Sequence, residues 1–156
     1  MSEACFGLFY MENYRNTGVK IMSGESVFIS SSCFNLDNTF NNGQCFRWER
    51  LDENSYGGVA CGRFLKIIQE ENGVRLLNTS EEDYKNIWEN YFDLGTDYEA
   101  VERSLRTDSI MERAVNAGHG MRILRQELWE VLISFIISQN NNISRIKKII
   151  GNICRQ

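Results

Sequence analysis

The chain has 156 residues, of which 42% are hydrophobic, and a net charge of −4. This length supports one good core, so we expect one domain or one and a half. The five cysteines form no CxxC pair and accompany a single histidine, which argues against a zinc site and against a disulfide framework. The longest apolar run, 128–137, is too short to cross a bilayer, and no signal peptide is recognisable. Composition therefore predicts a soluble intracellular protein with reduced thiols and no bound metal.

The first half of the chain has the pattern of an antiparallel sheet. Its segments are short, rich in β-branched and aromatic residues, and separated by glycine and asparagine. Asn72 and Gly73 tolerate the positive φ of a tight turn, so the stretch around them predicts a β-hairpin. The expected strands are VKIM (19–22), SVFISSS (26–32), CFRWERL (45–51), YGGVACG (56–62), RFLKIIQE (63–70) and GVRLLN (73–78).

The periodicity changes near Thr79 and becomes helical. Thr79 or Ser80, with an acidic residue three positions later, resembles a capping box, and aromatic and aliphatic residues then recur at helical spacing. We therefore expect an α+β fold that consists of a β-rich unit, 1–79, and a helical unit, 80–156. Further helices are expected at 98–106, 109–117, 126–138 and 142–154.

The last two expected helices differ in the distribution of their apolar residues. The run 128–137 is apolar nearly all round, which is typical of a central, buried helix. The next helix is amphipathic, and the sequence supplies no partner for its apolar stripe. We therefore expect the chain to be the first part of something larger and to self-associate on its own. The stripe consists of Ile143, Ile146, Ile150 and Ile153.

Between these helices lies the segment 138–145, SQNNNISR, which is unusually rich in amides. Asparagine competes with the backbone for hydrogen bonds, so Asn140, Asn141 and Asn142 should end one helix and cap the next. Their amides both donate and accept, and Arg145 adds a planar fork of donors. This combination suits the edge of a nucleobase. Alternatively, the run is only a cap in a helical interaction protein.

Charge is unevenly distributed along the chain. The stretch 70–112 has twelve acidic and four basic residues, whereas 120–156 has six basic and two acidic residues. Local positive potential governs attraction to phosphate, so the C-terminal end is the candidate face for nucleic acid despite the negative total. The competing interpretation is that Lys147 and Lys148 form only the solvated face of a helix.

A second candidate segment, 41–48 (NNGQCFRW), joins two expected strands. It is either an ordinary hairpin loop followed by core aromatics, or a loop in which Gly43 lets bare backbone approach a planar ligand. Taken alone, the segment favours the first interpretation.

With both segments in view, the chain resembles the 8-oxoguanine DNA glycosylases of the OGG type. The matching stretches are GQCFRW (43–48), YFDL (91–94), ILRQELWEVLISFI (123–136) and NNNISR (140–145), and the resemblance begins near residue 20. It implies a TBP-like antiparallel β-sheet domain followed by the first helices of a helix-hairpin-helix glycosylase domain. It also implies double-stranded DNA containing 8-oxoguanine as the partner, no cofactor, and a location in the cytoplasm (nucleoid) if the protein is bacterial.

The resemblance further implies roles for individual residues. The Gly43 carbonyl would accept a hydrogen bond from the N7–H of oxidised guanine and would repel the lone pair that guanine has there. Asn140 would fill the gap left by the flipped base, and with Arg145 it would read the cytosine opposite. The residues expected to be structural or adjacent to phosphate are Asn141, Asn142 and Lys148.

The implied function is the N-terminal part of a base-excision glycosylase with AP lyase activity. The family's helix-hairpin-helix with its catalytic lysine, and the aspartate that follows it, have no counterpart among these 156 residues. We therefore assign no catalytic residue and expect this chain alone to be inactive. The alternative is a non-catalytic module of the same descent that binds damaged DNA.

Overall fold

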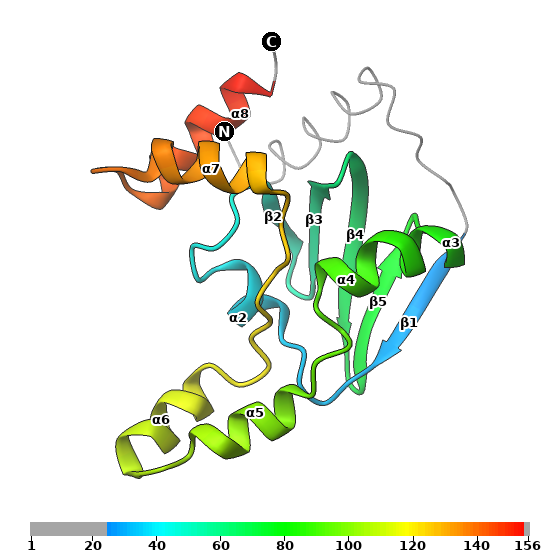
Figure 1. Cartoon of the computed structure of the whole chain (residues 1–156). Helices are drawn as coiled ribbons and strands as arrows, with labels where there is room; N and C mark the ends of the chain where they lie inside the picture. Colours follow the sequence, from blue (N-terminus) through cyan, green and yellow to red (C-terminus); the bar gives the residue numbers. More distant parts are fainter. Residues whose placement is uncertain (1–24, 155–156) are drawn as a thin grey trace.

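A five-stranded antiparallel sheet forms the centre of the computed structural model, which describes residues 25–154 (Figure 1). The strand order is β1-β5-β4-β3-β2, so each chain neighbour from β2 to β5 is also a neighbour in the sheet. The expected strand 19–22 lies outside the described residues. The strands are β1 (Ser26–Ser30), β2 (Trp48–Asp52), β3 (Ser55–Ala60), β4 (Arg63–Glu70) and β5 (Gly73–Leu77).

The turn between β3 and β4 sets the register of the central strands. Ala60 pairs with Arg63, so Cys61 and Gly62 form a two-residue turn. Both turn residues have positive φ, 51° and 68°, the conformation that a tight hairpin of this kind requires. The predicted strand 56–62 therefore ends two residues earlier than expected.

The next hairpin joins β4 and β5, as predicted, but its turn is displaced by one residue. Glu70 pairs with Gly73, so the turn residues are Glu71 and Asn72. Gly73 belongs to the strand because it pairs with Ser30 of β1 as well as with Glu70 of β4. Only glycine fits there, since a Cβ would lie 2.0 Å from the Ile29 carbonyl oxygen. The close approach of β1, which the local turn pattern does not reveal, accounts for the difference.

Helices make up most of the remaining chain, and the predicted change of periodicity at residue 79 is confirmed. Ser80 caps the first helix after this point, since its hydroxyl accepts a hydrogen bond from the Asp83 N–H at 3.1 Å. This helix runs without interruption through α3 (Glu81–Asp83), the π-helical turn η1 (Tyr84–Trp88) and α4 (Glu89–Tyr91). The other helices are α2 (Leu36–Phe40), which was not predicted, α5 (Tyr98–Leu105), α6 (Ser109–Ala117), α7 (Leu128–Ser138) and α8 (Ile143–Ile153).

The core lies between the sheet and the continuous helix formed by α3, η1 and α4, which covers one face of the sheet. Trp48 of β2 is almost fully buried and stacks on Phe40 of α2, with ring centroids 4.4 Å apart. Its indole N–H donates to the hydroxyl of Tyr91 at 2.9 Å. The core thus crosses the predicted boundary at residue 79, while the division into two units stays a prediction. Other core residues are Leu65, Ile67, Val74, Leu76, Trp88 and Phe92.

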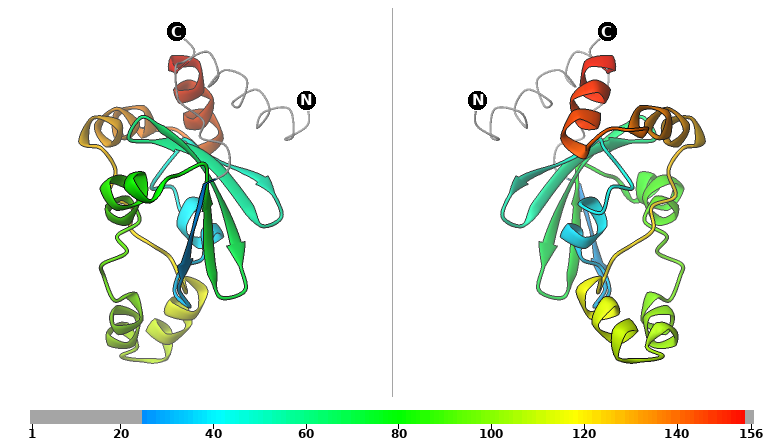
Figure 2. Two further views of the ribbon diagram at one scale, coloured as in Figure 1. Left: turned by 90° about the vertical axis from the view of Figure 1, so that its right-hand side faces the viewer. Right: turned by 90° about the vertical axis from the view of Figure 1, so that its left-hand side faces the viewer.

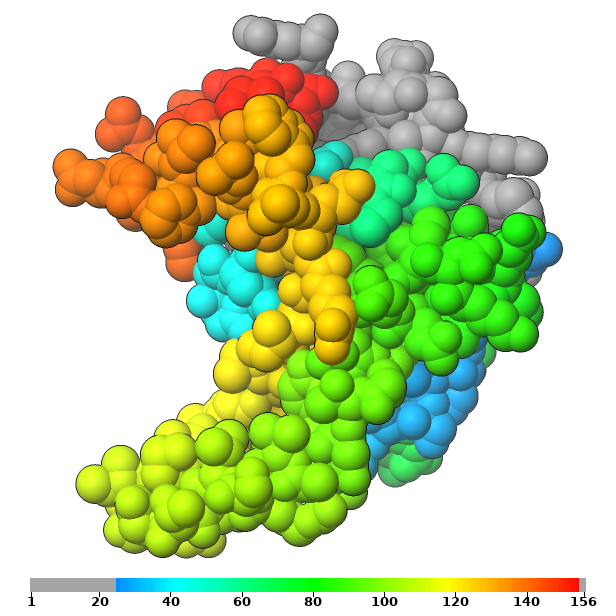
Figure 3. Space-filling view, viewed as in Figure 1, coloured from blue at the N-terminus to red at the C-terminus, as the bar shows by residue number. Residues whose placement is uncertain are grey.

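The remaining helices form two groups at opposite ends of the molecule (Figures 1 and 2). The α5–α6 hairpin extends from one end, and α7 and α8 lie at the other. In the space-filling view, one side of the molecule is hollowed between these groups (Figure 3). No helix within residues 25–154 is long and apolar enough to cross a membrane.

Helix α7 differs from the expected central, buried helix. It contains no buried residue, and Leu128 and Phe135 are 82% and 63% exposed. The helix is apolar, as its sequence predicts, but no element within residues 25–154 covers its outer side. Its burial is therefore not achieved within the described chain.

Helix α8 is more buried than expected. Ile146 and Ile150 are buried against Phe46 and Ile137, whereas Ile143 and Ile153 at the ends of the stripe remain about half exposed. The inference that the sequence supplies no partner for the stripe is thus wrong for its two central residues. Phe46 lies far away in the sequence, and helical periodicity does not identify such a partner.

Candidate nucleic-acid interface

The two segments singled out in the sequence lie side by side. Gly43 lies in the loop before β2, and a Cβ built on it would be 3.9 Å from the Cδ1 atom of Ile143, the first residue of α8. Three residues after Gly43, Phe46 packs against the buried side of α8. The loop 41–47 is therefore fixed next to the turn 138–142, and the two form one surface.

Gln44 fixes the backbone immediately after Gly43. Its side-chain Nε2 donates to the carbonyls of Thr39 and Arg122, both at 2.8 Å, and its Oε1 accepts from the Leu124 N–H at 2.9 Å. The Gln44 carbonyl accepts from the side chain of Gln126 at 2.6 Å. Sequence reasoning missed Gln44, although it lies within the GQCFRW stretch.

The same loop is also tied to α7. Arg47 forms an ion pair with Glu130, with 3.2 Å between Nη1 and Oε2. Burial raises the pKa of the Glu130 carboxyl, and the positive charge of Arg47 opposes that rise. Between Gly43 and Arg47, Cys45 is buried, and this burial raises the pKa of its thiol to about 12. Cys45 is therefore a protonated core residue at neutral pH.

Asn141 and Asn142 hold the turn between α7 and α8. The Asn141 side chain donates to the Ile137 carbonyl at 3.1 Å, which satisfies a carbonyl of the last turn of α7. The Asn142 side chain accepts from the Arg145 N–H at 3.0 Å and so caps α8. These two amides are engaged in local structure, which is the role expected for them.

Asn140 and Arg145 differ from these two residues because their side chains are exposed and make no hydrogen bond within residues 25–154. Asn140 has a φ of +53°, in the left-handed region that asparagine tolerates better than most residues. Arg145 lies in the first turn of α8. An exposed amide and an exposed guanidinium, neither bonded to another described residue, thus project from a turn whose backbone is held by its neighbours.

Three of the five basic residues within 120–154, namely Arg122, Arg125 and Lys147, are engaged in contacts within the chain, and Arg155 lies outside the described residues. Lys147 donates to the Trp48 carbonyl at 3.0 Å and lies 3.4 Å from Glu49, and Arg125 pairs with Asp93 at 2.8 Å. Lys148 is exposed and has no ion pair in the described part of the chain.

Arg122, the third engaged basic residue of this region, is buried and structural. Its Nε and Nη1 atoms donate to the carbonyls of Cys33 and Asp93, at 3.2 and 3.0 Å, and its guanidinium lies 4.5 Å from the ring centroid of Tyr98. Burial lowers the pKa of this guanidinium. Arg122 was counted with the basic residues in the sequence, and only the fold reveals that it cannot reach a phosphate.

Comparison with known families identifies the domain. The family model described as 8-oxoguanine DNA glycosylase, N-terminal domain, matches residues 26–132. The N-glycosylase/DNA lyase of Saccharomyces cerevisiae is 33% identical over 146 residues, which cover 81% of this chain and 37% of that protein. The N-glycosylase/DNA lyase OGG1 of Arabidopsis thaliana is 27% identical over 132 residues, which cover 72% of this chain and 32% of that protein.

Solved structures give the same result. A structure of MBOgg1 in complex with a low-affinity DNA ligand superposes with a TM-score of 0.80 at 45% identity, over 84% of this chain and 46% of that one. The apo form of Clostridium acetobutylicum 8-oxoguanine glycosylase/lyase has a TM-score of 0.80 at 41% identity, over 84% and 46%. Its complex with double-stranded DNA containing cytosine opposite 8-oxoG has a TM-score of 0.76 at 38% identity, over 85% and 48%. The chain thus spans less than half the length of these relatives.

Proposed function

Because the chain belongs to the 8-oxoguanine DNA glycosylase family, we propose that it recognises 8-oxoguanine opposite cytosine in double-stranded DNA. We further propose that it does so as the N-terminal part of a base-excision glycosylase with AP lyase activity. The observation that carries this proposal is the junction of the Gly43 loop with the turn 138–142. Two segments distant in sequence there form a single surface. It presents the exposed side chains of Asn140 and Arg145, which have no hydrogen-bond partner within residues 25–154.

The Gly43 carbonyl is the proposed lesion-reading group. Oxidised guanine has an N–H donor at position 7, whereas guanine has an acceptor lone pair, so a fixed carbonyl attracts the first and repels the second. Opposing two acceptors costs about 1 to 3 kcal/mol, or roughly a tenfold to hundredfold preference. The hydrogen bonds of Gln44 support this role because they restrict movement of the adjoining peptide.

Asn140 and Arg145 are the proposed readers of the opposite strand. Flipping the damaged base leaves a gap beside an orphan cytosine, whose pairing edge offers two acceptors and one donor. The guanidinium of Arg145 donates to the acceptors, and the amide of Asn140 occupies the gap and accepts from the donor. Both side chains are exposed and have no hydrogen-bond partner in the described part of the chain, which supports these roles, whereas Asn141 and Asn142 are engaged in capping.

The glycosylase and lyase steps require an amine nucleophile that forms a Schiff base with the sugar. Lys66 lies 3.8 Å from Asp52, and Lys147 is held by Trp48 and Glu49. Lys85 and Lys148 are exposed, Lys20 lies outside the described residues, and none of these five lysines lies in a glycine-rich hairpin. We therefore propose that this chain binds the lesion and does not cleave. Incubation with an 8-oxoguanine duplex and borohydride tests this point. A covalent adduct would show that a lysine of this chain is the nucleophile, whereas its absence leaves the binding function intact.

The decisive experiment compares the Arg145→Ala variant with Lys148→Ala. Both residues are exposed on α8, but only Arg145 adjoins the capped turn. Affinities are measured for duplexes with 8-oxoguanine opposite cytosine, 8-oxoguanine opposite adenine, and undamaged guanine opposite cytosine. Arg145→Ala should reduce the preference for cytosine over adenine by about tenfold or more, because one good bidentate contact is worth about 1 to 3 kcal/mol.

Lys148→Ala should weaken binding to all three duplexes equally, as expected for a phosphate contact. If Arg145→Ala also lowers all three affinities by one factor, Arg145 does not read the opposite base. If the unmodified chain does not distinguish 8-oxoguanine from guanine, the proposed function of this chain is wrong.

A further inference from the structure

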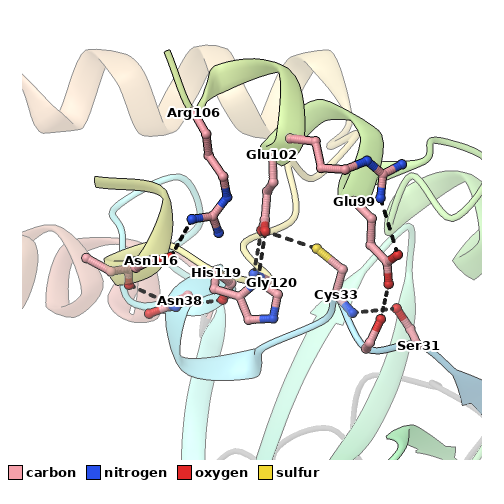
Figure 4. A network of polar contacts seen from close by, with 12 residues as sticks. Ser31, Cys33, Asn38, Glu99, Glu102, Arg106, Asn116, His119 and Gly120 are labelled. Atoms are coloured by element: carbon pink, nitrogen blue, oxygen red, sulfur yellow. Dashed lines mark hydrogen bonds and ion pairs between the residues drawn. The ribbon is translucent and has the colours of Figure 1, made fainter. Parts of the chain in front are cut away.

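Three potential metal ligands from separate segments meet away from the candidate interface (Figure 4). Cys33 follows β1 and is buried, Glu102 lies on α5, and His119 follows α6. The Cys33 thiol is 3.2 Å from one carboxylate oxygen of Glu102, and the His119 Nδ1 atom is 2.8 Å from the other. All three ligand atoms lie within 4.8 Å of one another.

These distances match a small coordination sphere. A tetrahedral zinc ion with bonds of about 2.0 to 2.3 Å separates its ligand atoms by about 3.5 Å. The separations of 3.2 and 2.8 Å are somewhat shorter than this value, and no two ligand atoms are more than 4.8 Å apart, so small side-chain rotations suffice to admit an ion. We propose that Cys33, Glu102 and His119 bind a divalent zinc ion, with water as the fourth ligand.

The kinds of donor select the metal. A thiolate together with an imidazole and a carboxylate is a mixed set that favours zinc, whereas magnesium and calcium prefer oxygen ligands alone. The His119 side chain is 52% exposed, which leaves solvent access for the water ligand. The neighbouring backbone also orients the carboxylate, because the Gly120 N–H donates to Glu102 at 2.9 Å.

The arrangement does not fit a cysteine nucleophile. In such a site the imidazole contacts the thiol and removes its proton, and a third group orients the imidazole. Here Glu102 stands between the two, and the thiol donates to the carboxylate. The negative carboxylate next to the sulfur disfavours a reactive thiolate. The same arrangement places three potential metal ligands around one point.

Metal binding must displace the thiol proton. Burial, followed by the hydrogen bond to Glu102, raises the pKa of Cys33 to about 11, and the nearby charge of Arg122 acts in the opposite direction. The S–H bond breaks, a bond from sulfur to zinc forms, and the proton passes to the buffer.

A bound ion would link the end of β1, α5 and the turn after α6. These elements position the base of the α5–α6 hairpin, so the ion would fix that hairpin to the sheet (Figure 1). The absence of CxxC spacing led to the expectation of no zinc site. The three ligands come from distant parts of the chain, so their convergence follows from the fold alone.

The test uses the 156-residue chain with Cys154→Ser, since Cys154 is exposed and would bind metal adventitiously. Zinc binding is measured by calorimetry, and the metal environment is probed with cobalt(II). We expect one ion per chain, a thiolate-to-cobalt charge-transfer band and a thermal midpoint that rises with zinc concentration. Stoichiometry per chain is unaffected by self-association.

Two variants and one control locate the ion. Cys33→Ser and His119→Gln should each reduce zinc affinity by about 100-fold or more, since loss of even an indirect partner of a ligand costs 10- to 100-fold. His119→Gln also covers the case in which Cys33→Ser misfolds, because His119 is exposed. Cys61→Ser removes a partly exposed thiol outside the cluster and should change nothing. If no cobalt band forms, or if both ligand variants retain the affinity of the control, the proposal is overturned.

Discussion

The Gly43→Ala substitution separates a contact with the lesion from a requirement of the turn. Gly43 has a φ of +86°, so any other residue is strained there, at a cost of about 1 kcal/mol. No steric term is added, because the nearest atom to a new Cβ is 3.9 Å away, at ordinary contact distance. We therefore expect a loss of about 1 kcal/mol in the free energy of unfolding and a larger loss in binding 8-oxoguanine duplex.

Gly62→Ala is the matched control. Gly62 has a φ of +68° and no atom within 4 Å of a built Cβ, so it carries the same backbone cost without steric conflict. It lies in the turn between β3 and β4, outside the candidate interface. Unfolding in urea and binding to duplexes with 8-oxoguanine or guanine are measured for both variants. If Gly43→Ala and Gly62→Ala lose the same stability, and both bind the 8-oxoguanine duplex only slightly more weakly than wild type, the role given to the Gly43 carbonyl is refuted.

Four further predictions concern stability and association. Gly58→Ala should lower the free energy of unfolding in urea by about 2 to 3 kcal/mol, since its Cβ would lie 2.4 Å from the buried ring of Trp48. An unchanged urea midpoint would mean that this ring moves freely. Arg122→Met should lower the free energy of unfolding by about 1 to 3 kcal/mol, because the buried Cys33 carbonyl loses its donor, whereas the Asp93 carbonyl keeps the Thr96 N–H. A loss below about 1 kcal/mol would show that water replaces the guanidinium.

Hydrogen bonds from Gly120, His119 and Cys33 outweigh burial and hold the pKa of Glu102 below its ordinary value of 4.5. The stability difference between wild type and Glu102→Gln, measured with chelator present, should therefore be fully present above pH 4.5. It should fade as the pH falls through the lower pKa that Glu102 has in the folded state. Phe135→Ser should weaken concentration-dependent association in sedimentation without loss of stability, because Phe135 is exposed. Unchanged association would exclude this face of α7 as the self-association surface.

Elements with signals at both ends were predicted most closely. Helix α6 has the expected bounds because Asp108 caps its start, accepting from two backbone N–H groups, and Gly118 follows its last residue. Helix α2 was missed because five residues are too few for periodicity to register, although Asn35 caps it. Capping residues can be recognised in the sequence, but the helix between them is recognised only when it is long enough to show helical periodicity.

Long-range packing left no such trace. The composition of α7 indicates an apolar helix but not which neighbour covers it, and the partner of Ile146 and Ile150 is an aromatic residue from the loop before β2. In the same way, Gln44 looks like an ordinary polar loop residue until its amide is seen to join the loop to residues 122–126. The sequence could identify the candidate segments, but not the contacts that bring them together.

The charges of α8 illustrate how the fold refines a motif. Successive helical residues are about 100° apart, so Arg145 and Lys148 lie about 60° apart around the axis, while Lys147 lies about 160° from Arg145. Once Phe46 fixes which side of the helix is buried, Lys147 falls beside β2 and pairs with Glu49. Arg145 and Lys148 remain exposed on the other side. In the proposed function, attraction of α8 to phosphate rests on these two residues, and comparing their alanine variants separates reading of the base from attraction by charge.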